Sequence, residues 1–209
     1  MHWLRPRYLS RAVPNGIRKE PFFIPATSTL RNSICQSNPL PHHCSPRRHF
    51  NSTKTAMAAT TATLKAFFEA QKFAVVGAST NKAKFGYKVF EWYVYHDLLV
   101  TPVNPGSPEI EVDGKPFATV ASLSALESPG VTAVSIITPP VVTQKTLAEA
   151  KELGIQAVFL QPGTFDDDVL AYARENFATV VAGPGGSSSN GEWCVLVDGE
   201  RGLQAVGKL

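Results

Sequence analysis

The sequence predicts an α/β fold with a doubly wound, mostly parallel five-stranded sheet flanked by helices. Two observations carry this prediction. From about residue 64 onward, short apolar runs rich in β-branched residues alternate with longer stretches of helical periodicity, which is the pattern of βαβ crossover units. Residues 132–137 form a run without charge or polar alternation, as expected for a parallel strand that is covered on both faces.

The expected elements alternate along the chain. The expected strands are residues 73–76, 98–103, 132–137, 157–160 and 179–182. The expected helices are residues 63–71, 87–96, 142–153 and 164–176. Asp113 and Gly114 predict a small hairpin or an irregular excursion within residues 111–119. Residues 183–191 are rich in glycine and serine, which predicts a mobile lid or a flexible loop, and the apolar residues 193–197 predict a further strand.

Composition narrows the functional class. The chain has 209 residues, of which 44% are hydrophobic and 18% charged, and a net charge of +3. Residues 1–59 hold nine Lys or Arg and one acid, a net of +8, whereas residues 60–209 hold eleven and sixteen, a net of −5. The excess of basic residues thus belongs to the amino-terminal segment and gives no support to nucleic-acid binding by the rest of the chain.

Two further classes of protein are excluded. No apolar run approaches the roughly 18 residues of a membrane span. Three cysteines exclude a disulfide-rich secreted scaffold.

Residues 1–59 have the composition of a mitochondrial transit-type leader, because they are rich in arginine and serine and contain Glu20 as their one acid. We expect a disordered leader at 1–59, a folded domain at 60–209 and a location in the mitochondrial matrix. The alternative is a basic tail without a targeting role. Met57 is the second methionine of the chain, and a start there would give a leaderless cytosolic form. Loss of the leader leaves Cys194 as the single cysteine, which fits a reducing compartment.

The candidate site lies after the strands, because ligands of doubly wound sheets bind beyond the carboxyl ends of the strands. After the first strand, Gly77 allows a sharp turn and a close approach of a ligand. The amides that follow, the hydroxyls of Ser79 and Thr80 and the next helix N-terminus form a candidate anion site, to which Lys82 and Lys84 add positive charge. The spacing differs from the Gly-x-Gly-x-x-Gly fingerprint. The alternative is a plain strand-to-helix turn with solvent-facing lysines.

Two further strand ends complete the candidate site. The second strand ends at Val103 and Asn104 without the Asp or Glu that usually holds a ribose hydroxyl in dinucleotide-binding folds, which argues against a standard NAD site. The third strand runs into Thr138, Pro139 and Pro140, a hydroxyl and two prolines that form a rigid apolar lip suited to a flat ring. The alternative for these prolines is entry into the next helix.

Five sequence features follow one another in a characteristic order. They are FAVVGAST at 73–80, VTPVNPG at 100–106, SIITPP at 135–140, AVFLQPGTFDD at 157–167 and the late Cys194. Together they resemble the CoA-binding domain family, the stand-alone counterpart of the amino-terminal domain of the succinyl-CoA synthetase α subunit, over roughly residues 65–205. The resemblance implies a Rossmann-like fold and coenzyme A as the ligand.

The resemblance also implies a role for each matching position. The phosphate loop would be Gly77, Ala78, Ser79 and Thr80, with Lys84 facing the phosphates. The adenosine-phosphate side would be Pro102, Val103 and Asn104, and the nucleotide or pantetheine path would be Thr138, Pro139 and Pro140. The chain departs from the synthetase at the second strand, where the synthetase motif carries a lysine and Asn104 follows Val103 here.

Catalysis by this chain alone is not expected from the resemblance. The synthetase needs a phosphorylated histidine in a further domain and a separate nucleotide-binding subunit, whereas the one histidine after the leader is His96, at an expected helix end. We expect a protein that binds CoA or acyl-CoA and acts as a carrier, a sensor or a partner of a larger acyl-CoA enzyme. The alternatives are an NAD(P)-dependent oxidoreductase and a thiol redox sensor through Cys194, although a cysteine buried in the expected strand 193–197 is a simpler interpretation.

The remaining polar residues give no sign of a metal site. The acids at 166–168 fit the start of a helix, where negative charge is favourable, and no His, Cys or Asp set has metal-ligand spacing. The oligomeric state stays open at this stage.

Overall fold

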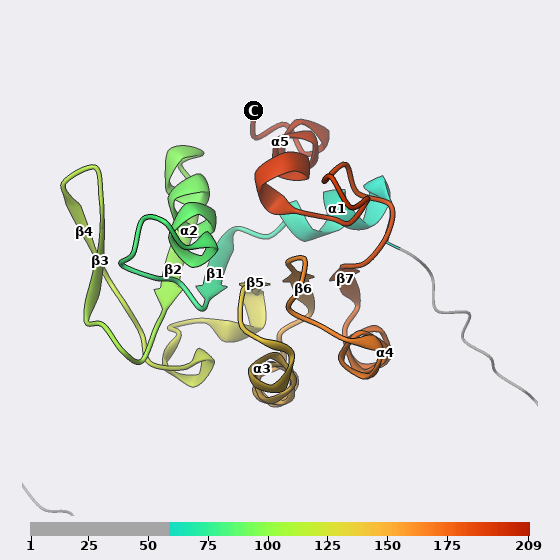
Figure 1. Cartoon of the computed structure of the whole chain (residues 1–209), viewed down its shortest axis with the longest axis horizontal. Helices are drawn as coiled ribbons and strands as arrows, with labels where there is room; N and C mark the ends of the chain where they lie inside the picture. The colour runs from blue at the N-terminus through green and yellow to red at the C-terminus, as the bar shows by residue number, and fades with distance from the viewer. Residues whose placement is uncertain (1–58) are drawn as a thin grey trace, which may run out of the picture. The chain divides into compact units, whose positions relative to one another are not determined.

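The computed structural model describes residues 59–209, so that almost all of the predicted leader, including Met57, lies outside the described residues. Within residues 59–209 the chain forms seven strands, five α-helices and two short 3-10 helices. Figure 1 shows the main sheet with helices on either side of it.

The main sheet has five strands, all parallel, in the order β2-β1-β5-β6-β7. These strands are β1 (Lys72–Val76), β2 (Leu99–Val103), β5 (Thr132–Ile136), β6 (Ala157–Leu160) and β7 (Thr179–Val181). The chain steps outward from β1 to β2 and then returns to the other side of β1 to form β5, so the direction of winding reverses between β1 and β5. This is the 2-1-3-4-5 order of doubly wound α/β proteins when the hairpin strands are left out. The predicted fold class is therefore confirmed.

Helices cover both faces of the main sheet. On one face lie α1 (Thr61–Phe68), α2 (Phe85–Tyr95) and α5 (Val195–Ala205), and on the other lie α3 (Pro140–Glu152) and α4 (Asp167–Asn176) (Figure 1). Each face has its own apolar core, and the residues of β1 alternate between them, with Phe73 and Val75 in one core and Ala74 and Val76 in the other. The central strand is thus covered on both faces, as the apolar runs in the sequence predict.

The predicted hairpin is present. β3 (Glu109–Val112) and β4 (Lys115–Ala118) pair antiparallel around Asp113 and Gly114, whose φ angles of 50° and 75° match a type I′ turn. Beyond the hairpin, Val120 forms a parallel bridge with Val103 of β2. This bridge brings the chain back to the carboxyl end of the sheet before the 3-10 helices at Leu123–Ala125 and Pro129–Val131.

The prediction of a strand at residues 193–197 is wrong, because this run is the start of a helix. Cys194 is the N-cap residue of α5, and Val195 is its first residue. Val195 is fully buried and Val197 is 53% exposed, so the apolar residues divide between the two sides of a first helical turn.

Two glycines weaken the helical signal of α5 in the sequence and allow its close packing in the structure. A Cβ atom on Gly199 would lie 2.4 Å from the Trp92 ring of α2, and one on Gly202 would lie 2.3 Å from the Phe68 ring of α1. Glycine within a helix costs about 1 kcal/mol relative to alanine, so these positions weaken the helical signal. In return, α5 packs directly against large aromatic side chains of its two neighbours.

Candidate functional site

The crevice at the carboxyl ends of β1 and β5 is where the winding of the sheet reverses. Gly77 follows β1 with a φ of +86°, and a Cβ atom on it would lie 3.1 Å from Thr138 Cγ2 and 3.3 Å from the Ile137 carbonyl. Both the positive φ and the close approach of the chain after β5 therefore require glycine at this position. The two chain segments leave the crevice toward opposite faces, one into α2 and the other into α3.

The loop after β1 turns tightly before α2 begins. The Ser79 hydroxyl accepts the Asn81 N–H at 3.1 Å, and the Asn81 side chain accepts the Ala83 N–H at 2.9 Å. Lys84 is the N-cap residue of α2, and no side chain caps the helix there. Thr80 and Lys84 are exposed. The first amides of α2 and the partial positive charge of its amino end thus face the loop without a protein acceptor side chain.

Gly86 lies directly behind this loop. A Cβ atom on Gly86 would come within 2.1 Å of the Gly77 carbonyl oxygen and 3.4 Å of the Ser79 amide nitrogen. The first turn of α2 therefore touches the backbone of the loop itself. Gly86 is not among the site residues predicted from the sequence, although a glycine directly before the expected helix at 87–96 is a signal of such a close contact.

Asn104 ties the end of β2 to the same loop. Its Nδ2 donates to the Ala78 carbonyl at 2.9 Å, its Oδ1 accepts the Gly106 N–H at 2.7 Å, and the Gly77 N–H donates to the Val103 carbonyl at 3.2 Å. Both polar atoms of the Asn104 side chain thus form hydrogen bonds. These bonds fix the loop after β2 against the loop after β1. Ala78 and Pro102, two of the predicted binding residues, are buried in this contact region.

A cavity of about 270 Å³ opens beside Gly77, between the ends of β1, β2 and β5 and the helix α3. Its walls are mostly apolar or uncharged. The lining residues are Val76, Gly77, Val103, Asn104, Pro105, Ala121, Ser122, Leu123, Thr138, Val142, Thr146 and Glu149. Glu149 is the one charged side chain among them, and its Oε1 accepts the Ser124 N–H at 2.9 Å.

The structure brings four of the predicted site residues together around this cavity, namely Gly77, Val103, Asn104 and Thr138. The others lie beside it: Ala78, Ser79, Thr80 and Lys84 follow in the loop, Pro102 is within β2, and Pro139 and Pro140 start α3. Sequence reasoning missed the wall contributed by α3. Val142, Thr146 and Glu149 recur at positions i, i+4 and i+7, a spacing that predicts one shared helix face.

The two prolines after β5 form the entry of α3. Pro139 is the N-cap residue and Pro140 the first helical residue, where a missing N–H has no cost. The Thr143 hydroxyl donates to the Thr138 carbonyl at 2.8 Å and lies 2.9 Å from the Thr138 hydroxyl. As in α2, no side chain caps this helix, so both helices begin at the crevice without a side-chain cap.

Buried polar side chains connect the end of β6 to α5. Gln161 is 4% exposed. Its Nε2 donates to the Ser135 hydroxyl of β5 at 3.2 Å, and its Oε1 accepts the Val195 N–H of α5 at 3.0 Å. Gln161, directly after β6, therefore caps α5 and fixes the helix at the same edge of the sheet.

Asp198 holds the chain before α5 in place. Its buried carboxylate accepts the N–H groups of Ser187 and Cys194, each at 3.0 Å, and pairs with Arg201 Nη2 at 3.1 Å. Cys194 itself is half-buried, and burial raises the pKa of its thiol. A raised pKa keeps the thiol protonated near neutral pH, which lowers its reactivity.

Two further polar side chains of the described region, those of His96 and Asp166, have structural partners. The His96 ring Nδ1 lies 2.7 Å from the Trp92 carbonyl at the end of α2, and His96 is at a helix end as expected. Asp166 accepts the Val169 N–H at 2.9 Å and caps α4. Within residues 59–209, no three His, Cys, Asp or Glu side chains gather as a metal site, and none of the helices there is long and apolar enough to cross a membrane.

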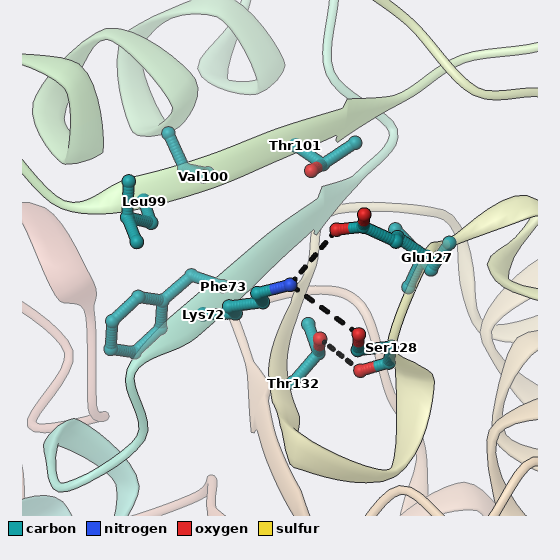
Figure 2. Close-up of a pocket in the computed structure, with 9 residues that line it drawn as sticks. Lys72, Phe73, Leu99, Val100, Thr101, Glu127, Ser128 and Thr132 are labelled. Carbon is teal, nitrogen blue, oxygen red and sulfur yellow. Dashed lines mark hydrogen bonds and ion pairs between the residues drawn. The ribbon is translucent and has the colours of Figure 1, made fainter.

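A second cavity of about 220 Å³ lies at the opposite edge of the sheet, where β1, β2 and β5 begin (Figure 2). Lys72, the first residue of β1, is its most prominent polar group. The Lys72 ammonium pairs with Glu127 Oε2 at 3.0 Å and donates to the Ser128 hydroxyl at 3.4 Å. This cavity is separated from Gly77 by the whole length of β1, so it is not part of the crevice.

Two solved structures share the fold of this chain, and a third is similar in sequence. The hypothetical protein from Pyrococcus horikoshii OT3 is 22% identical, with 58% of this chain and 83% of that chain covered and a TM-score of 0.51. Prb, described as the PH1109 protein redesigned for binding, is 21% identical, with 72% and 94% covered and a TM-score of 0.55. A conserved hypothetical protein from Pyrococcus furiosus is 28% identical, with 51% and 87% covered and a TM-score of 0.45.

The segment that contains the crevice matches a known protein family. No curated protein is significantly similar to this chain. A family described as a CoA binding domain matches residues 71–185, which include every strand of the main sheet and the loops at Gly77, Asn104 and Thr138. This match covers more than half of the sequence, and the chain therefore belongs to the CoA binding domain family.

Proposed function

We propose that this protein binds coenzyme A or an acyl-CoA in the crevice between β1 and β5 and has no catalytic activity of its own. The observation that carries the proposal is the position of the Gly77 loop. In a chain of the CoA binding domain family, this loop lies between the uncapped amino end of α2 and an apolar cavity. A diphosphate and a nucleoside ring need these two environments side by side.

The diphosphate is proposed to bind at the loop and the amino end of α2. Backbone N–H groups and a helix dipole stabilise anions without any basic side chain. Lys82 and Lys84 are exposed in the same loop and supply positive charge that further favours phosphates. Gly86 supports this arrangement, because its lack of a side chain lets the first turn of α2 lie against the Gly77 carbonyl.

The adenosine is proposed to occupy the cavity beside β2. With a volume of about 270 Å³, the cavity is slightly smaller than typical small-molecule sites, which span roughly 300–1,000 Å³. It therefore suits one end of a long ligand. The pantetheine arm would then run past Thr138 and Pro139, the path that the family resemblance implies, and continue toward Gln161 and the first turn of α5.

The absence of catalysis is part of the proposal, and the environments of Cys194 and His96 support it. The Cys194 thiol has a raised pKa, and His96 lies against the Trp92 carbonyl. The same thiol pKa makes a redox sensor through Cys194 the weaker alternative. An NAD(P)-dependent oxidoreductase is also weaker, because Asn104 occupies the end of β2 with an amide whose two polar atoms are already bonded.

Thermal unfolding of the full chain with CoA, NAD and NADP at matched concentrations tests the proposal. A ligand present at 100 times its dissociation constant adds about 2.7 kcal/mol, and for a domain of this size that raises the Tm by roughly 5–10 °C. We expect this stabilisation with CoA and not with the other two. Stabilisation by NAD or NADP alone would overturn the CoA proposal and favour oxidoreductase assays.

We also propose that residues 1–59 direct the protein to the mitochondrial matrix, on the strength of their nine basic residues, single acid and high serine content. Mass spectrometry of the protein recovered from purified mitochondria and from cytosol measures its amino terminus. The proposal expects a shortened matrix form, with a form beginning at Met57 in the cytosol. Recovery of one full-length form from the cytosol would contradict it.

A further inference from the structure

The cavity proposed to hold the adenosine is lined by a carboxylate and by no Lys or Arg among residues 59–209. We propose that the adenosine end of the site disfavours a phosphate on the ribose 3′-hydroxyl, so that dephospho-CoA binds more tightly than CoA, which carries that phosphate. This inference rests on the proposed function, because it concerns the adenosine end of the same ligand in the same crevice.

The end of β2 is the place where this type of fold contacts the ribose. In this chain it consists of Asn104, Pro105, Gly106 and Ser107, without a cation. The Asn104 amide bonds to the Ala78 carbonyl and the Gly106 N–H. The Gly106 N–H is used by the same contact. The Gly106 N–H is therefore occupied, and the Asn104 side chain can offer a ribose phosphate only one uncharged N–H.

The cavity wall opposite β2 carries a negative charge. Glu149 of α3 lines the cavity, and the Ser124 N–H at 2.9 Å holds one of its carboxylate oxygens in place. No Lys or Arg among residues 59–209 lines this cavity. A carboxylate accepts a hydrogen bond from a ribose hydroxyl, as the second-strand acid does in dinucleotide-binding folds. The same carboxylate repels a phosphate dianion at that hydroxyl.

The nearest lysines do not offset the negative charge of Glu149 at the cavity. Lys82 and Lys84 are on the loop after β1, where the diphosphate is proposed to bind. Lys145 precedes Glu149 by one helical turn, but it is exposed and does not line the cavity. Exposed charges are screened by water and salt, whereas Glu149 is half-buried against the cavity. The charge that a ribose phosphate meets at close range is therefore negative.

Calorimetric titration of the full chain with CoA and with dephospho-CoA, at low ionic strength, tests the inference. We expect dephospho-CoA to bind at least about threefold more tightly, a difference of roughly 0.7 kcal/mol, and the ratio to shrink as salt is added. Glu149→Gln keeps an oxygen acceptor for the Ser124 N–H and removes the charge. This variant is expected to bind CoA more tightly than the native chain and to bring the two affinities together.

The matched control is Glu152→Gln, which removes an exposed carboxylate from the last turn of the same helix and is expected to leave both affinities unchanged. Thermal unfolding of each variant verifies that it is folded. CoA binding as tightly as dephospho-CoA, or more tightly, would overturn the inference and leave the proposed function standing. An unchanged affinity ratio in Glu149→Gln would overturn it as well. If neither ligand binds, the proposed function itself is wrong.

Discussion

Gly86→Ala is expected to weaken CoA binding about 30-fold or more. The added Cβ atom would lie 2.1 Å from the Gly77 carbonyl oxygen and 3.2 Å from its carbonyl carbon, so the first turn of α2 and the loop after β1 must move apart. Such overpacking costs about 1–3 kcal/mol, and the displaced amides are those proposed to hold the diphosphate. A loss of about 2 kcal/mol in binding corresponds to the 30-fold change. Isothermal titration with CoA measures it.

Gly130→Ala is the matched control for this experiment. Gly130 lies in the 3-10 helix before β5, and a Cβ atom on it would meet one neighbouring atom, the Leu153 carbonyl oxygen at 4.0 Å. This variant is expected to bind CoA like the native chain. Thermal unfolding verifies that Gly86→Ala is folded. If the folded variant binds CoA with native affinity, the amino end of α2 does not hold the diphosphate.

Asp198→Ala is expected to cause the largest loss of stability, about 3 kcal/mol or more. The carboxylate is 1% exposed and accepts the N–H groups of Ser187 and Cys194. Hydrogen bonds to charged groups contribute about 1.5–3 kcal/mol each, and loss of the acceptor leaves their donors unpaired. The ion pair with Arg201 is lost as well. For a domain of this size the Tm is expected to fall by roughly 6–12 °C.

Two measurements accompany the Asp198 variant. Asp168→Ala removes an exposed carboxylate from the first turn of α4 and is expected to cost less than about 1 kcal/mol. Limited proteolysis is expected to cut the segment around Ser187 faster in Asp198→Ala, because the carboxylate connects this segment to α5. A stability within 1 kcal/mol of the native chain would contradict the role assigned to Asp198.

Local sequence patterns predict most of the sheet. The uncharged run of β5 is buried at every position, and Asp113 and Gly114 adopt the positive φ angles that a two-residue hairpin turn requires. The start of α5 shows where such patterns fail. Its apolar residues 193–197 match a strand in isolation, and Gly199 lowers its helical propensity. The glycine is explained by the close packing on Trp92, which depends on contacts between distant parts of the chain.

The candidate site is predictable to a similar extent. Gly77, Val103, Asn104 and Thr138 follow strands whose carboxyl ends meet, so the position of the strand ends alone brings them together. The α3 wall of the cavity could not be found in this way, because the contact between Glu149 and Ser124 depends on how the 3-10 segment returns to the sheet after the hairpin. The role of Asn104 as a link between two loops also follows from tertiary geometry.

The most direct test of the central claim locates the ligand at single residues. Titration of the isotope-labelled protein with CoA, followed by amide NMR, is expected to shift the signals of Gly77, Ser79, Gly86 and Thr138 most strongly. Signals of Lys72 and Leu99, at the cavity shown in Figure 2, are expected to stay in place. Shifts centred on Lys72 and Leu99, with Gly77 and Gly86 unmoved, would contradict binding of CoA at the crevice between β1 and β5.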